Sequence, residues 1–199
     1  DPFYHAVADR FVYNPNPFQL SAVACVSDFL CKTVADKCSE SLPVRCIPSG
    51  TPVPENNVDR PTDTLRLAYV GRVVEEQKQV SLLTKALLRA TSEIEGVEAT
   101  LYGDGNASES VETLISNAES SKVRFAGHLS SNEIQERLLE SHVIVLLSDY
   151  EGTPMAVMEG MACGCVPVCL RIRSGIPELV KDGVTGLLVD DRGDGFVTA

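Results

Sequence analysis

The stretch VIVLLSDYEGTPMAVMEGMACGCVPVCL, residues 143–170, is the part of the chain that most directly indicates the fold. Residues 143–149 are almost continuously apolar, which is typical of a strand buried on both faces of a parallel sheet. A helix is expected to begin near Thr153 or Pro154, because proline is tolerated in the first turn of a helix. Residues 165–170 predict the next strand. The stretch therefore predicts a strand–helix–strand unit with parallel strands.

The same alternation of short apolar runs and amphipathic stretches starts at residue 65. Further strands are expected at 65–72, 97–105, 122–129 and 185–190, and further helices at 78–94, 108–120, 130–142 and 176–183. Ser108 is the expected N-cap of its helix, and Ser130 with Glu133 matches a capping box. This alternation predicts an α/β protein with a Rossmann-like, doubly wound parallel sheet and right-handed crossovers.

The chain before residue 65 has a different organisation. Residues 21–38 are expected to form a strand and a helix, and 43–50 another strand. Residues 51–64 are rich in proline, asparagine and charged residues, which is typical of a linker. We therefore expect 1–50 to be the C-terminal remnant of a preceding Rossmann-like domain, and 65–199 to be a second domain cut short at its end. Because Asp1 is not a start methionine, the chain is expected to be a fragment.

Composition excludes several classes of protein. The net charge of -11 disfavours nucleic acid as the main partner. No apolar run approaches the about 20 residues of a membrane span, and the first residues lack the features of a signal peptide, so a cytoplasmic location is expected. The seven cysteines are odd in number and irregularly spaced, which argues against a disulfide framework or a zinc site. Most of them are expected to be small core residues.

Ligands of doubly wound sheets bind at the carboxyl ends of the strands, so the residues just after each strand are the candidates for a site. GRVVEEQK follows the first strand of the second domain. Gly71 permits a close approach of backbone, and Arg72 and Lys78 are cations suited to a diphosphate. The alternative is that both are surface charges paired with Glu75 or Glu76.

The helix after residues 143–149 is flanked by two carboxylates. Its N-terminus offers free N–H groups and a partial positive charge to an anion. Glu151 precedes the helix, and Glu159 is the one ion within a nearly apolar segment. A buried ion needs a partner, and the candidates are a ligand hydroxyl and the cations Arg72 and Lys78. The alternative is an ordinary helix with one solvated and one capping glutamate. His128, after the third strand, is open to interpretation as a base, a ligand or a packing residue.

The turn GDG, residues 103–105, does not complete a dinucleotide-binding fingerprint. Ser108 occupies the position of the last glycine, and the turn follows the second strand rather than the first. An NAD(P)-dependent oxidoreductase is therefore a weak alternative. The sequence has no P-loop, which disfavours an ATPase.

Five motifs in order resemble one known family. YEGTPMAVMEGMACGCVPV resembles the Glu-x7-Glu segment of retaining family-4 glycosyltransferases, also described as glycosyl transferases group 1, which have the GT-B fold of two Rossmann-like domains. YVGRVVEEQK, LYGDG, VRFAGHLS and SGIPELVKDGVTGLLV are similar to the family's other motifs. The resemblance covers about residues 20–199 and implies that residues 65–199 are the C-terminal, donor-binding domain of such an enzyme.

The resemblance implies transfer of a sugar, of the hexosyl type, from a nucleotide-diphosphate sugar with retention of anomeric configuration. Arg72 and Lys78 would hold the donor diphosphate, and Glu151 would contact the transferred sugar. The leaving phosphate would take the proton of the acceptor. No metal and no cofactor besides the donor substrate are implied.

The remaining implied residues contact the nucleotide and its phosphates. Backbone of the loop after the third strand would contact the base, amides at the helix N-terminus would contact phosphate, and Glu159 would bind the ribose. The donor-binding residues implied in this way are Gly71, Gly127, His128, Leu129, Gly152, Thr153, Met155, Ala156 and Glu159.

The sequence departs from the family pattern at two places in this site. Lys78 stands six residues after Arg72, where the family often has a spacing of five. Pro154 stands where a glycine is common and removes one N–H group from the turn.

The missing N-terminal domain would bind the acceptor, which is a sugar, a lipid or another small molecule, and could make peripheral membrane contact. The isolated chain is therefore expected to be inactive. The non-enzyme alternative is a nucleotide-binding regulatory or scaffold domain without transferase activity. A donor site that only senses the nucleotide sugar would have the same sequence as one that serves catalysis.

Overall fold

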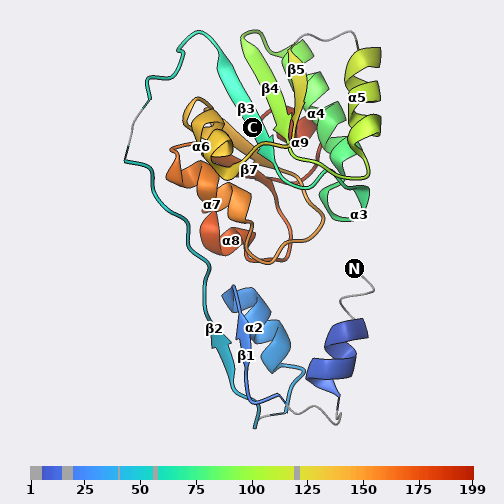
Figure 1. The fold of residues 1–199 in the computed structure, drawn as a ribbon, viewed down its shortest axis with the longest axis vertical. Helices are drawn as coiled ribbons and strands as arrows, with labels where there is room; N and C mark the ends of the chain where they lie inside the picture. The colour runs from blue at the N-terminus through green and yellow to red at the C-terminus, as the bar shows by residue number, and fades with distance from the viewer. Residues whose placement is uncertain (1–5, 15–19, 40, 56–57, 119–121) are drawn as a thin grey trace.

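The computed structural model describes residues 6–14, 20–39, 41–55, 58–118 and 122–199 (Figure 1). The N-terminal part forms a small unit in which β1 and β2 pair in parallel and one helix packs beside them. Its elements are the π-helix η1 (Asp9–Tyr13), β1 (Val23–Cys25), α2 (Asp28–Ala35) and β2 (Val44–Cys46). The strand, helix and second strand expected within residues 21–50 are all present.

The larger part is built on a six-stranded sheet with the order β5-β4-β3-β6-β7-β8. Every neighbouring pair of strands is parallel. The strands are β3 (Leu65–Val70), β4 (Val97–Tyr102), β5 (Val123–Gly127), β6 (Val143–Leu146), β7 (Val166–Leu170) and β8 (Leu187–Val189). This order places β3 next to β6 at the centre of the sheet and confirms the doubly wound, Rossmann-like fold.

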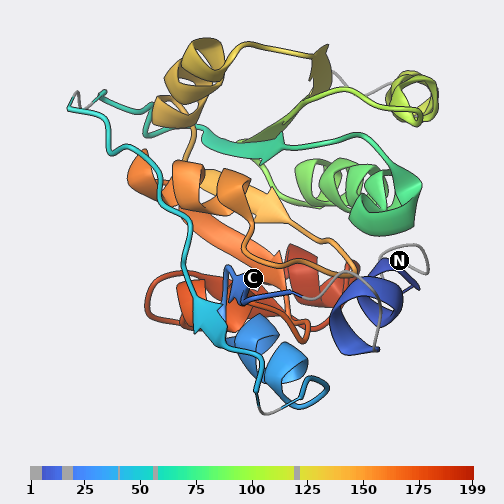
Figure 2. The ribbon, with the colours of Figure 1, turned by 60° about the horizontal axis from the view of Figure 1, so that its bottom comes forward.

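Helices cover both faces of the sheet (Figures 1 and 2). The helices on one face are α4 (Val80–Glu93), α5 (Ser108–Asn117) and α9 (Asp194–Val197). Those on the other are α6 (Ser131–Leu139), α7 (Met155–Ala162) and α8 (Ile176–Leu179). The one-turn helix α3 (Glu75–Lys78) lies between β3 and α4. No helix in the described parts of the chain is both long and apolar enough to cross a membrane.

Position in the sheet explains the residue pattern of each strand. Every side chain of the central strand β6 is buried, which accounts for its continuous apolar run. The edge strand β5 alternates instead, with Val123 buried and Arg124 exposed. The largest core cluster joins Leu101 of β4, Val145 of β6 and Leu87 of α4. Burial of this apolar surface is the main favourable contribution to folding.

Glycine at position 103 is required by the close approach of two loops. Gly103 has a φ of +145°, and a Cβ atom there would lie 1.8 Å from the carbonyl oxygen of Gly71. The loops after β3 and β4 therefore contact each other through backbone, at a position where glycine avoids the clash that a side chain would cause.

The helix expected at 78–94 is interrupted by Gln79, which has a left-handed φ of 49°. The side-chain amide of Gln79 donates a hydrogen bond to Asp149 Oδ2 at 2.7 Å. This contact with the loop after β6 holds Gln79 at the point where α3 ends and α4 begins. Sequence periodicity alone does not predict such a break, because the contact is distant in sequence.

One of the two expected N-caps is wrong. Ser130 and Glu133 form the predicted capping box at the start of α6. Ser108 is not an N-cap, because its hydroxyl donates to the carbonyl of Gly105 at 2.9 Å and Ala107 precedes the helix. The last residues of the helix expected at 108–120 lie outside the described residues.

The seven cysteines are free thiols. Cys25, Cys163, Cys165 and Cys169 are buried, as expected for small core residues. Burial raises the pKa of Cys165 to about 11 and that of Cys169 to about 12, so both are neutral packing groups near neutral pH.

Gly160→Ala is expected to destabilise the fold by about 1–3 kcal/mol, because overpacking a well-packed contact strains it. A Cβ atom at Gly160 of α7 would lie 2.7 Å from Ile144 Cγ2 of β6. Urea unfolding gives the measurement. Gly50→Ala is the matched control, because nothing lies within 4 Å of a Cβ atom there. Equal stability of the two variants would contradict close packing of α7 on β6.

Candidate functional site at the carboxyl ends of β3 and β6

The strand order reverses between β3 and β6, which are adjacent in the sheet but far apart in sequence. The chain leaves β3 towards α4 on one face and leaves β6 towards α7 on the other (Figure 2). A crevice forms at the carboxyl ends of strands at such a switch point. The loops that follow these two strands carry most of the residues predicted for the site.

The loop after β3 is held by contacts of its own backbone. Gly71 donates its N–H to the carbonyl of Tyr102, and the hydroxyl of Tyr69 donates to the carbonyl of Arg72 at 2.7 Å. The side chain of Arg72 is exposed, and its guanidinium donates to Oε1 of Gln77. The loop therefore presents a cation at the carboxyl end of β3.

Lys78 and Glu151 form a buried ion pair between the two loops. Lys78 Nζ lies 2.5 Å from Glu151 Oε1, and the two side chains are only 12% and 8% exposed. The spacing of six from Arg72 does not move Lys78 away, because it is the last residue of α3 and faces the crevice side. The alternative pairing is absent, since Glu75 instead accepts hydrogen bonds from Ser81.

Helix α7 begins at Met155, with Pro154 as N-cap rather than within the first turn. Pro154 contributes its carbonyl oxygen, which accepts from Val157 at 3.1 Å. The N–H groups of Met155 and Ala156 form no hydrogen bond within the described parts of the chain. These two amides are available to an anion at the positive end of the helix dipole.

Glu159 lies in the second turn of α7 and lines a cavity of about 360 Å³. Burial raises the pKa of its carboxyl group. Within the described residues it has no hydrogen-bond or ion-pair partner, and Lys78 and Arg72 are engaged elsewhere. From the sequence, Glu159 is expected to pair with a ligand hydroxyl or with Arg72 or Lys78. Neither cation pairs with it in this structure, so its carboxylate is available to a ligand.

The cavity also collects residues from the loop after β5 and from the linker. Leu129 lines it together with Glu159, whereas His128 is exposed and is not among its lining residues. The carbonyl of Gly127 accepts from the N–H of Gly103, which fixes the start of the loop. The remaining lining residues are Thr51, Pro52, Pro54, Val70, Ser131, Asn132, Ile134, Gln135, Leu138 and Cys163.

The small N-terminal unit contacts the loop after β6 directly. The hydroxyl of Thr153 donates to the carbonyl of Val26 at 2.8 Å, so this predicted site residue is engaged by the small unit. A Cβ atom at Gly152 would lie 3.4 Å from Leu30 and Val26. Glu178 of α8 accepts hydrogen bonds from the first N–H groups of α2 at 2.9 and 2.7 Å.

Several residues of this region were not predicted. Gln77 and Glu178 were missed because their roles arise from contacts between loops, and the linker residues were missed because proline-rich segments have no local signal for lining a cavity.

Ser148, at the exit of β6, is 1% exposed, and its hydroxyl has no hydrogen-bond partner in the described part of the chain.

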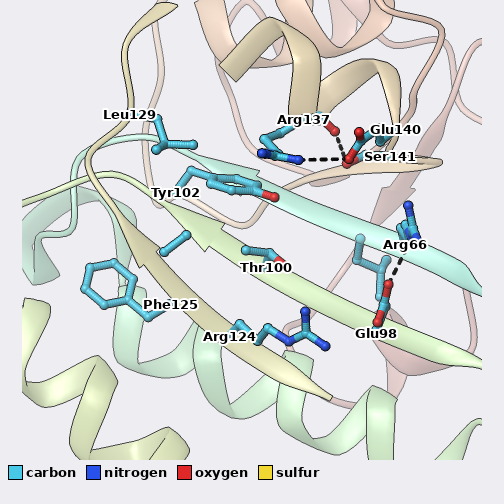
Figure 3. A pocket seen from close by; sticks show the side chains of 12 residues that line it. Arg66, Glu98, Thr100, Tyr102, Arg124, Phe125, Leu129, Arg137, Glu140 and Ser141 are labelled. Atoms are coloured by element: carbon cyan, nitrogen blue, oxygen red, sulfur yellow. Dashed lines mark hydrogen bonds and ion pairs between the residues drawn. The ribbon is translucent and has the colours of Figure 1, made fainter. Parts of the chain in front are cut away.

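A second hollow, of about 510 Å³, runs along the face of β3, β4 and β5 beside α6 (Figure 3). Four of its charged side chains pair with one another, Arg66 with Glu98 at 2.9 Å and Arg137 with Glu140 at 3.2 Å. It extends along the strands and not only at their carboxyl ends, so the switch-point crevice is the better candidate site.

In the described residues, no group of three or more histidine, cysteine, aspartate or glutamate side chains is placed to hold a metal ion. Independence from metal remains a prediction, to be tested by chelation.

Lys78→Met is expected to destabilise the protein by about 3 kcal/mol, because it leaves the buried carboxylate of Glu151 without its partner. The double variant Lys78→Met/Glu151→Leu is expected to regain most of this loss, since two apolar side chains replace the pair. Urea unfolding of the two single variants and the double variant completes the cycle. Strictly additive losses would contradict a direct ion pair.

Glu159→Gln is expected to change how stability depends on pH. A raised pKa in the folded state means that folding favours the protonated carboxyl. The wild-type protein therefore loses stability as pH rises from the ordinary value of 4.5 through the folded pKa. Above that window Glu159→Gln should unfold at a higher temperature than the wild type, and below it the two should converge. A difference independent of pH would contradict a raised pKa.

Comparison with known proteins identifies the family of the chain. The model of the family glycosyl transferases group 1 matches residues 55–195. The D-inositol 3-phosphate glycosyltransferase of Mycolicibacterium smegmatis is 31% identical over 142 residues, which are 67% of this chain and 31% of that protein. The chain spans about a third of the length of the first curated relatives it matches.

Two solved structures show the same fold. Anabaena Alr3699/HepE, in complex with UDP and glucose, has a TM-score of 0.74 at 18% identity, covering 89% of this chain and 51% of that chain. The lipopolysaccharide outer core galactosyltransferase WaaB in its apo form has a TM-score of 0.73 at 22% identity, with the same coverage of 89% and 51%. The larger part of the structure thus has the architecture of the C-terminal half of a GT-B glycosyltransferase, and the chain belongs to the glycosyl transferases group 1 family.

Proposed function

We propose that this chain is the donor-binding half of a retaining family-4 glycosyltransferase that uses a nucleotide-diphosphate sugar. The observation that carries the proposal is Glu159, an unpaired and partly buried carboxylate on the wall of a cavity at the switch point. Leaving such a group without a partner costs free energy, which a ligand that donates hydrogen bonds recovers. A ribose diol is such a ligand, because two adjacent hydroxyls can donate to one carboxylate.

The diphosphate lies, in this proposal, between the two loops. Arg72 and Lys78 supply positive charge from the β3 side, and the free amides of Met155 and Ala156 supply donors from the start of α7. Cations and oriented amides stabilise the charge that develops on the leaving phosphate. They do the work that a metal ion does in other transferases, and so we propose a metal-independent reaction.

The base occupies the cavity beside Leu129, and the loop of Gly127 and His128 contacts it largely through backbone. UDP is the first nucleotide to test, because the structurally similar HepE was solved with UDP and glucose. Backbone contacts leave few side-chain signals, so the identity of the base requires measurement.

Glu151 contacts the transferred hexosyl group, and the ion pair with Lys78 holds this carboxylate in place. The acceptor hydroxyl bonds to the anomeric carbon on the same face from which the nucleoside diphosphate leaves, and the departing phosphate oxygen takes the proton of that hydroxyl. This arrangement gives retention without a separate general base.

The acceptor half belongs to the rest of the protein. We propose that 1–50 is the remnant of that half, 51–64 the connection and 65–199 the donor domain. The acceptor is a sugar, a lipid or another small molecule, the enzyme acts in the cytoplasm, and any peripheral membrane contact comes from the other half. The 199-residue chain alone is therefore expected to bind donor without transferring sugar.

Calorimetric titration of the chain with UDP, GDP, ADP and NAD, with and without EDTA, tests the proposal. One nucleoside diphosphate is expected to bind, with an affinity that EDTA leaves unchanged. Arg72→Ala and Glu159→Ala should each weaken binding by about tenfold or more, because each removes charge-assisted or buried hydrogen bonds.

Arg124→Ala is the matched control, because Arg124 is an exposed arginine of the hollow beside α6. It should leave the affinity unchanged. Binding of NAD alone would favour an oxidoreductase domain and contradict the proposal. Nucleotide binding without sugar transfer by the full-length protein would favour a regulatory or scaffold domain.

A further inference from the structure

Gln77 lies between the two loops of the site and bonds to both. Its Oε1 accepts from the guanidinium of Arg72, in the loop after β3. Its Nε2 donates to the carbonyl of Tyr150, in the loop after β6, at 2.9 Å. Its main-chain carbonyl accepts from the N–H of Asp149, also at 2.9 Å.

A carboxamide suits this place because it offers an acceptor and a donor on one rigid group. Arginine can only donate, and a main-chain carbonyl can only accept. Glutamate at position 77 would lose the bond to Tyr150, and lysine would repel Arg72. Glutamine satisfies both neighbours with a single side chain.

The contact restricts a side chain that is otherwise free to move. Arg72 is exposed, and a free arginine side chain loses rotamer entropy when it is fixed. Holding the guanidinium before the ligand arrives removes part of that cost from binding. The same side-chain amide also bonds to Tyr150, the residue before Glu151. It therefore holds the guanidinium of Arg72 at a fixed distance from the loop that carries Glu151.

We propose that Gln77 is a positioning residue that orients Arg72 toward the donor diphosphate and joins it to the loop that carries Glu151. This inference rests on the proposed function, because it needs a diphosphate at Arg72. It assigns a role to a motif residue that was not among the predicted site residues, one position before the lysine that pairs with Glu151.

A double-mutant cycle separates positioning of Arg72 from general support of the loops. The ligands are the nucleoside diphosphate that binds tightest among UDP, GDP and ADP, and its parent nucleoside. The variants are Gln77→Met, Gln77→Ala, Arg72→Ala and the double variant Arg72→Ala/Gln77→Met. Glu76→Ala, an exposed neighbour on α3, is the matched control. Circular dichroism and thermal unfolding confirm that each variant folds.

Gln77→Met is expected to weaken binding of the diphosphate by about tenfold, because Arg72 loses a charge-assisted hydrogen bond. It should change nucleoside binding less than about twofold, and it should add less than about twofold in the Arg72→Ala background. Gln77→Ala should behave in the same way, and Glu76→Ala should match the wild type.

An unchanged affinity for the diphosphate in Gln77→Met and Gln77→Ala would overturn the inference and leave the proposed function standing. So would an equal loss with and without Arg72, or an equal loss for nucleoside and diphosphate, since both indicate support of the loops alone. If the wild-type chain binds no nucleoside diphosphate, the proposed function fails and the inference fails with it.

Discussion

The reversal of strand order between β3 and β6 is the constraint on which the candidate site depends. A parallel sheet needs a crossover after each strand, and a change of direction in the strand order sends neighbouring connections to opposite faces. The loops of Arg72 and Glu151 therefore lie side by side and are joined by Lys78 and Gln77. Every other feature of the site, including the start of α7 and the cavity at Glu159, lies around this opening.

Two glutamates of the same motif have opposite environments. Glu151 is nearly buried but paired with Lys78, so its charge is compensated within the protein. Glu159 is less buried and unpaired, and burial raises the pKa of its carboxyl group. The two environments suit different tasks in a site for a ligand with both charges and hydroxyls. The carboxylate of Glu151, paired with Lys78, keeps a fixed position, whereas the unpaired carboxylate of Glu159 gains hydrogen bonds when a ligand binds.

Much of the fold follows from the sequence, because continuous apolar strands and helical periodicity are local signals. The Ser130–Glu133 capping box and the buried strand β6 were predicted from such signals, and both are present. The break at Gln79 and the roles of Gln77 depend on contacts with the loop after β6, more than sixty residues away. Placing Glu159 at a cavity wall likewise required the linker residues that close the other side. Local propensity carries no information on such pairs, so they emerge only when the sheet brings the loops together.

The loop that carries Glu151 follows β6 of the sheet and also contacts the small N-terminal unit. Glu178 caps the start of α2 with a charged acceptor, which satisfies two N–H groups that a helix leaves free. The hydroxyl of Thr153, in the loop after β6, donates a hydrogen bond to the carbonyl of Val26 in the small unit. Displacement of the small unit must break these bonds, and the bond of Thr153 lies two residues from Glu151 and two residues from the start of α7. The small unit is thus joined to the candidate site by hydrogen bonds as well as by the linker. Pro52 and Pro54 of the linker line the Glu159 cavity, so the linker also contributes to the candidate site.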